Sequence, residues 1–308
     1  MALEWFDVFP FFEMFICIFA LVSSIHFFYI IVNAAILQAT SRPFLLLFSV
    51  SLFLLAMSHG LKTSEVLLGI RPEEMEMGFS LRLHVWSLLH EFAFALHSLS
   101  LFMFSGERYI VAKFAMLPTT RNKVIAFVLA VVISSLSMIY AQIIHMVNFN
   151  IMAVTCMNIV DCAALLILVL SSKFSIKHYK MTVGVIPLEM RFQISDVYIW
   201  TKTIIPIASL AFLVKFTYVI VIWLLSTVAG SLDFQIKFSN YYETAMDLFT
   251  VSLPFLIKSN HRRLKNLSLR NRHVKPKPQL HVKTLDGRAI HMKETIQDHF
   301  EFLKNHWK

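Results

Sequence analysis

Long apolar runs, separated by short polar segments, fill the first 258 residues of this 308-residue chain. A helix that crosses a hydrocarbon core about 30 Å thick needs roughly 20 such residues in a row. Seven runs approach or exceed this length and are predicted to be membrane-spanning helices: 12–37, 44–66, 85–105, 124–146, 151–171, 203–228 and 241–258. We therefore expect an all-α membrane protein, with a seven-helix transmembrane bundle over residues 1–258 and a separate tail over residues 259–308.

Two of these runs have alternative boundaries. The second can end near Gly60 instead of continuing through Lys62 and Glu65. The fifth is separated from the fourth by residues 147–150 alone, which is a short connection between two helices. The number of spans therefore depends most on whether the fourth and fifth runs form separate helices.

The composition supports lipid as the solvent of this bundle. Hydrophobic residues make up 57% of the chain and charged residues 15%, whereas soluble proteins carry about 25% charged residues. The sequence has no recognisable metal-ligand cluster, nucleophile–base set or phosphate-binding loop, so we expect neither an enzyme nor a bound cofactor or metal. The three cysteines, Cys17, Cys156 and Cys162, lie inside predicted helices and are most simply interpreted as small buried apolar residues.

The distribution of Lys and Arg predicts how the bundle is oriented. With the N-terminus outside, the predicted inside segments hold 23 Lys or Arg and the outside segments hold 4, and Lys215 lies within a span. Cytoplasmic loops carry the excess of basic residues in membrane proteins. Without the tail the count is still 10 to 4. We therefore expect the N-terminus outside and the C-terminus in the cytoplasm.

The net charge of +9 comes from the C-terminal segment. Residues 258–308 carry 13 Lys or Arg and 4 acids, and the remaining 257 residues balance at 15 to 15. Because a membrane lies beside this segment, anionic inner-leaflet lipid is the expected partner rather than nucleic acid. Residues 258–272 are predicted to form a short basic amphipathic helix on that surface.

A charged triplet, Glu107-Arg108-Tyr109, closes the third run at its predicted cytoplasmic end. The physical explanation is an arginine that extends to the membrane interface. The triplet also resembles the acid–Arg–aromatic motif that ends the third helix of G-protein-coupled receptors. Other features of the rhodopsin-like pattern are missing: the sixth run has no C-W-x-P and the seventh has no N-P-x-x-Y.

The whole pattern is more similar to the nematode serpentine chemoreceptors of the Sra superfamily, with the Sre and Srab families nearest. The resemblance rests on "ERYIVA" (107–112), on "RFQISD" (191–196) and on "SLPFLIKSN" (252–260) before a basic tail. It implies a plasma-membrane receptor of sensory neurons, with their cilia as a candidate location, that detects a small-molecule ligand and signals to a heterotrimeric G protein. It also implies coupling roles for Glu107, Arg108, Tyr109 and Arg191.

Two other functional classes compete with a receptor. A secondary transporter is disfavoured because the chain has seven glycines, no inverted repeat and no paired interrupted spans. An odorant-gated channel of the insect type has seven spans with its N-terminus inside, which the distribution of basic residues opposes.

Ionisable residues inside predicted spans require partners, because each costs about 2.5–3.5 kcal/mol in the membrane. Asp161 and Lys215 lie at the middle of two consecutive, antiparallel spans. The sequence therefore predicts a buried Asp161–Lys215 ion pair. The pair can be structural, or it can belong to a ligand site.

Three further residues complete the predicted ligand pocket: Glu91 and His97 in the third span and Asp247 in the seventh. His90 and His97 are seven residues apart, which returns almost to the same helix face, and His84 lies six residues before His90, so the three descend one side that most simply contacts neighbouring helices. That spacing does not suit a metal site, which needs ligands at i and i+4. Glu243 and Asp247 also share a face, and together with Glu91 they predict an acidic outer pocket that favours cationic ligands.

Overall fold

The computed structural model is all-α. It describes residues 5–33, 40–68, 81–114, 120–147, 150–181, 188–228 and 232–260. The tail beyond residue 260, including most of the predicted basic helix, lies outside the described residues. The described ranges contain these helices: α1 (Trp5–Asn33), α2 (Arg42–Leu67), α4 (Leu81–Phe114), α5 (Thr120–Val147), α6 (Asn150–Met181), α7 (Leu188–Val228) and α8 (Leu232–Asn260).

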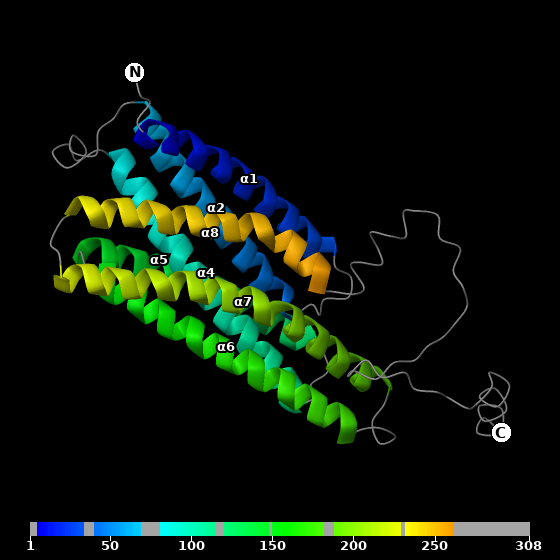
Figure 1. The fold of residues 1–308 in the computed structure, drawn as a ribbon. Coiled ribbons are helices and arrows are strands. Elements are labelled where there is room, and N and C mark those ends of the chain that lie inside the picture. The colour runs from blue at the N-terminus through cyan, green and yellow to red at the C-terminus, as the bar shows by residue number, and fades with distance from the viewer. Residues whose placement is uncertain are drawn as a thin grey trace, which may run out of the picture. The chain divides into compact units, whose positions relative to one another are not determined.

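The helices pack side by side as a bundle in which successive helices run in opposite directions (Figure 1). α4 occupies the centre and contacts α2, α5, α6 and α7, while α1 packs between α2 and α8. Helices suit this environment because a hydrocarbon core offers no water to satisfy backbone groups, and an α-helix bonds all of them internally. The expected seven-helix architecture is therefore the one observed among the described residues.

Six of these helices are long and apolar enough to cross a membrane: Phe9–Asn33, Arg42–Leu67, Val85–Phe114, Asn122–Ile144, Val154–Tyr179 and Ile194–Leu224. The protein is thus a multi-pass membrane protein. Helix α8 falls outside this set. It carries Glu243, Asp247 and Lys258 in its predicted span, and both acids are buried in the bundle. Because these two acids face the interior of the bundle, α8 can cross a membrane only when it is packed against the other helices.

The helix boundaries resolve the two uncertain runs. α2 continues past Gly60 to Leu67, and α5 and α6 are separate helices. α7 is the main departure, because it begins at Leu188 instead of near residue 203 and reaches 41 residues. Pro206 therefore lies well inside α7.

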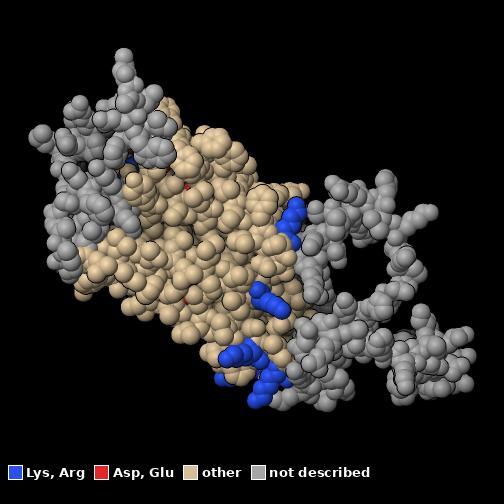
Figure 2. All heavy atoms as spheres, in the orientation of Figure 1, with Lys and Arg blue, Asp and Glu red and all other residues tan. Residues whose placement is uncertain are grey.

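The two ends of the bundle differ in charge. We call the end where α1 starts the N-terminal end, and the opposite end the basic end. Lys and Arg gather where α8 ends, and the flank of the bundle is uncharged (Figure 2). The exposed, described basic residues all lie toward that end: Lys113, Lys123, Lys173, Lys177, Lys202 and Lys258. The basic end is thus the one that the distribution of Lys and Arg predicts to face the cytoplasm.

Candidate functional site

A cavity of about 250 Å³ opens within the half of the bundle nearest the N-terminal end. Residues of six helices line it: Lys62, Trp86, Ser87, His90, Glu91, Phe94, Tyr140, Ile144, Val154, Tyr218, Tyr242 and Glu243. Five of these twelve residues are aromatic, and the rings of Tyr218 and Tyr242 stack with centroids 4.1 Å apart. An aromatic cavity with a few polar groups is the usual form of a small-molecule site.

Two carboxylates face this cavity, and their surroundings differ. Glu243 accepts hydrogen bonds from Lys62 Nζ at 3.0 and 3.1 Å, and that ammonium also lies 5.9 Å from the centre of the Trp86 ring. Among the described residues, no cation pairs with Glu91 and none donates a hydrogen bond to its Oε2 atom. Glu91 is therefore the acid in this cavity that is most able to accept a donor from a ligand.

The predicted Asp161–Lys215 pair is confirmed. Lys215 Nζ donates to Asp161 Oδ2 at 2.8 Å and to Ser98 Oγ at 2.9 Å, and Ser98 Oγ donates to the same carboxylate at 3.2 Å. Both charged side chains are almost fully buried. The ammonium also lies 4.5 Å from the centre of the Phe94 ring. This cluster joins α4, α6 and α7 at the middle of the bundle.

The ion pair adjoins the cavity without lining it. Phe94 lines the cavity and contacts Lys215, so its ring lies between the two. Of the five residues that the sequence predicted for the ligand pocket, Glu91 lines this cavity. His97, Asp161, Lys215 and Asp247 are buried elsewhere among the described residues.

The histidines of α4 face α2, as the spacing of seven predicted. His90 Nδ1 lies 3.3 Å from Ser58 Oγ, and the His97 ring lies 4.6 Å from that of Phe48. The His97 side chain is fully buried, and neither ring nitrogen has a hydrogen-bond partner in the described part of the chain. The side chain of His84 is outside the described residues.

At the basic end, Arg108 is fully buried in spite of its place near a helix end. Its guanidinium donates to Glu107 at 2.6 and 3.0 Å and to Ser41 Oγ at 2.6 Å. Thr40 Oγ1 donates to the same glutamate at 2.6 Å. The simpler interpretation of an arginine that extends to the interface is therefore wrong. Arg108 instead connects α4 to the start of α2.

Two of the three stretches that carry the receptor resemblance lie close to each other. Val111 and Ala112 of "ERYIVA" pack with Val197, the residue directly after "RFQISD", and with Phe174 of α6. Tyr109 also contacts Phe174, with ring centroids 5.6 Å apart. The side chain of Arg191 lies outside the described residues, although its backbone belongs to α7.

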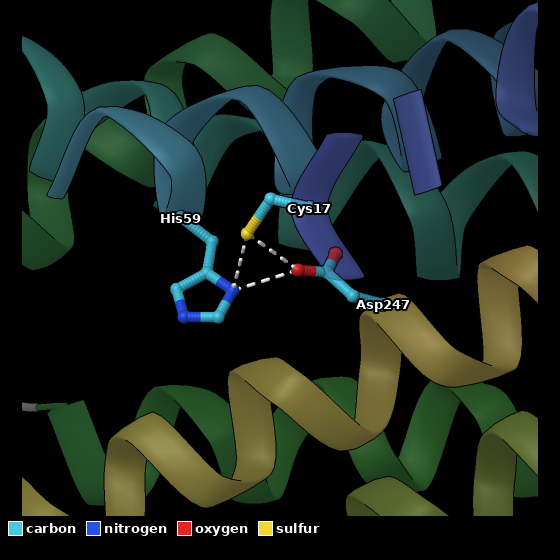
Figure 3. A group of neighbouring side chains, drawn as sticks. All are labelled: Cys17, His59 and Asp247. Atoms are coloured by element: carbon cyan, nitrogen blue, oxygen red, sulfur yellow. Dashed lines mark hydrogen bonds and ion pairs between the residues drawn. The ribbon is translucent and has the colours of Figure 1, made fainter. Parts of the chain in front are cut away.

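Near the N-terminal end, a second polar cluster joins α1, α2 and α8 (Figure 3). His59 Nδ1 lies 2.7 Å from Asp247 Oδ2, and Cys17 Sγ lies 3.3 Å from His59 Nδ1. The Cys17 thiol donates to Asp247 at 3.2 Å. Glu13 and Glu243 lie one turn nearer the N-terminal end on α1 and α8, and both are buried. Thr244 Oγ1 donates to Glu13 at 3.3 Å.

Sequence reasoning missed this second cluster. The expected common face of Glu243 and Asp247 is confirmed, since both contact His59, but Asp247 faces α1 and α2 rather than the cavity. Cys156 and Cys162 are exposed, so the expectation of buried cysteines holds only for Cys17. The cluster could have been found from the sequence by one feature: Glu13 and Cys17 on α1, and Glu243 and Asp247 on α8, are each four residues apart and so share a helix face.

Comparison with known proteins adds no family to this description. No protein-family model matches the chain, and no curated protein matches its sequence. The polar cavity, the central ion pair and the buried arginine lie along one helix, α4, in a bundle with a basic end. Sequence and structure together establish an all-helical, multi-pass membrane protein with six to seven long apolar helices.

Proposed function

We propose that the chain is a G-protein-coupled chemosensory receptor of the plasma membrane. A small extracellular ligand binds in the cavity near the N-terminal end, and a heterotrimeric G protein is contacted at the basic end. The observation that carries the proposal is that one helix, α4, contributes a residue to the cavity, to the central ion pair and to the buried cluster at the basic end. Glu91 faces the cavity, Ser98 joins the central ion pair, and Arg108 is held at the other end.

The proposed ligand is small and carries a hydrogen-bond donor, such as an amine. The volume of about 250 Å³ lies just below the 300–1,000 Å³ that is typical of ligand sites. Aromatic walls suit an apolar or cationic body, since a cation is attracted to the face of an aromatic ring. Glu91 supplies the acceptor at one wall of the cavity.

The proposed signal passes along α4. Seventeen residues separate Glu91 from Arg108, which corresponds to about 25 Å of helix at 1.5 Å per residue. A ligand that shifts α4 changes the contacts of Ser98 with Lys215 and those of Arg108 with Ser41. Both contacts join α4 to neighbouring helices, so the bundle has two places at which movement of α4 alters helix packing.

The test uses cells that express the full chain with a promiscuous G protein and a fluorescent calcium indicator. A panel of small amines and their neutral isosteres is applied, and we expect responses to a subset of the amines. Glu91→Gln should raise the half-maximal concentration roughly 10- to 150-fold, because a hydrogen bond to a charged group contributes about 1.5–3 kcal/mol. Glu65→Gln is the control, since Glu65 lies near the same end but does not line the cavity.

Three results would contradict the proposal. The first is an unchanged dose–response in Glu91→Gln for every active amine. The second is an N-terminal tag that is accessible only from the cytoplasm. The third is a ligand-evoked current that persists when nucleotide exchange on the G protein is blocked. That current would favour the odorant-gated channel, and uptake of the ligand against its gradient would favour the transporter.

A further inference from the structure

The side chains that meet between α1, α2 and α8 form a metal-ligand set as well as a hydrogen-bonded one (Figure 3). Cys17, His59 and Asp247 each offer one ligand atom, and these three atoms lie within 4.8 Å of one another. The two distances to sulfur are 3.2 and 3.3 Å. Ligands of a tetrahedral zinc ion, at about 2.0–2.3 Å from the metal, lie roughly 3.3–3.6 Å from one another.

The distance between His59 Nδ1 and Asp247 Oδ2 is shorter, at 2.7 Å. This is a hydrogen-bond distance, so a proton joins the two atoms when no metal is bound. When a metal binds, the neutral imidazole coordinates through Nδ1 and carries its proton on Nε2, which faces Glu243, and the Cys17 thiol releases its proton to become a thiolate. The arrangement therefore needs to expand by a few tenths of an ångström to accept an ion.

The charge around these residues independently favours a cation. Three carboxylates, those of Glu13, Glu243 and Asp247, are exposed by only 4, 8 and 2%. Among the described residues of this cluster, Lys62 is the one with a permanent positive charge, and it pairs with Glu243. With His59 neutral the set carries a net charge of −2, which is costly at membrane depth. Coordination converts the Cys17 thiol to a thiolate, so a bound divalent cation reduces the net charge of the set from −2 to −1.

The helices are arranged so that the ligands can approach closely. Gly60 follows His59 on α2, and a Cβ atom there would lie 3.6 Å from Cys17 Cβ, so α1 passes next to α2 at this level. Behind the ring, His59 Nε2 lies 3.6 Å from Glu243 Oε2. A carboxylate in that position fixes the orientation of a ligating histidine. Glu243 also lines the cavity, so the site lies beside the cavity.

We propose that Cys17, His59 and Asp247 bind a divalent transition-metal ion of the zinc class. Thiolate and imidazole ligands select zinc and similar ions over magnesium and calcium, which prefer oxygen ligands. Water or the Glu13 carboxylate takes the fourth position. The bound ion joins the first, second and last helices beside the ligand cavity. The inference does not depend on the proposed receptor function, because it concerns metal binding by the protein alone.

The test is Co²⁺ binding by the purified full-length chain in detergent after treatment with a chelator. We expect one Co²⁺ per chain, with a thiolate-to-cobalt absorption band in the near ultraviolet and tetrahedral bands in the visible, all lost when Zn²⁺ is added. Cys17→Ser should lose the thiolate band and bind Co²⁺ at least about tenfold more weakly. Cys162→Ser is the matched control, because Cys162 is an exposed cysteine away from the site.

A second measurement on the unmodified chain keeps the test decisive if Cys17→Ser does not fold. X-ray absorption at the zinc edge should show one sulfur ligand together with nitrogen or oxygen ligands. Absence of Co²⁺ binding, a thiolate band that survives in Cys17→Ser, or zinc bound through oxygen alone would overturn the proposal. None of these measurements uses a ligand or a G protein, so they do not test the receptor function.

Discussion

Arg108 lies near the end of a membrane helix, where a long side chain could reach water, yet its side chain is fully buried. Glu107, the residue before it, supplies the opposite charge, and Ser41 supplies a hydroxyl from the start of α2. The guanidinium also lies 5.6 Å from the centre of the Phe104 ring. Burial of a charge is tolerated when it is paired and hydrogen-bonded in this way. In this structure the guanidinium of Arg108 is therefore enclosed by its partners and not exposed at the basic end.

We expect Arg108→Ala to abolish coupling to the G protein while surface expression persists. The substitution removes the group that is proposed to contact the G protein, and Glu107 keeps a donor in Thr40. Ligand-evoked calcium signals and surface labelling measure the two properties separately. Lys113→Ala is the control, because Lys113 is an exposed basic residue near the same helix end. Normal signalling in Arg108→Ala would rule out the coupling role.

At the scale of elements, α6 and α7 are joined by the buried Asp161–Lys215 ion pair. α7 is 41 residues long, which is about 60 Å at 1.5 Å per residue, twice the thickness of a hydrocarbon core. A helix of this length, with Pro206 inside it, extends beyond the membrane on the side where Lys202 is exposed. The Asp161–Lys215 pair therefore determines how the membrane part of α7 is held against α6.

Asp161 and Lys215 should be energetically coupled. Removing one partner alone leaves a buried charge uncompensated, which costs about 3–5 kcal/mol. Asp161→Asn and Lys215→Gln should each lower surface expression or raise basal signalling, and the double variant should recover part of the loss. A double-mutant cycle on both readouts measures the coupling. Lys202→Gln controls for loss of an exposed lysine on α7, and strictly additive losses would show that the pair contributes no coupling energy.

At the scale of the whole molecule, the net positive charge lies in the C-terminal segment and not in the membrane-embedded part. Residues 258–308 account for the net charge of +9, and the rest of the chain is balanced. In the bundle, the exposed basic residues of the described ranges lie toward the basic end (Figure 2). The tail itself lies beyond the described residues. Its composition still predicts attraction to anionic lipid, by about 1 kcal/mol for each basic residue.

Neutralising the basic residues of segment 262–272 should therefore weaken the binding of the tail to the membrane, or trafficking of the protein, without changing ligand preference. The expected result is lower surface labelling with an unchanged rank order of active ligands. Exchanging Arg and Lys at the same positions is the control, because it keeps the charge and should keep surface labelling. A shift in the potency of one ligand relative to another would show that the segment acts on the binding site instead.

The sequence predicted contacts between helices that are consecutive in the chain better than contacts between distant ones. The Asp161–Lys215 pair followed from two adjacent antiparallel spans with charges at equal depth. The cluster of Cys17, His59 and Asp247 did not, because it requires α8 to pack against α1, which is more than 200 residues away. Burial of Arg108 was also missed, since its partner Ser41 belongs to a connection that hydropathy does not position.

Helix α8 has a consequence for how the protein is made. It is the last of these helices to leave the ribosome, and its two buried acids, Glu243 and Asp247, oppose partition into lipid by about 2.5–3.5 kcal/mol each. Their partners on α1 and α2 are synthesised first and must remain available until α8 arrives. Completion of the bundle during biosynthesis thus depends on recognition between the two ends of the chain, so a defect in α1 should appear as failure of α8 to enter the membrane.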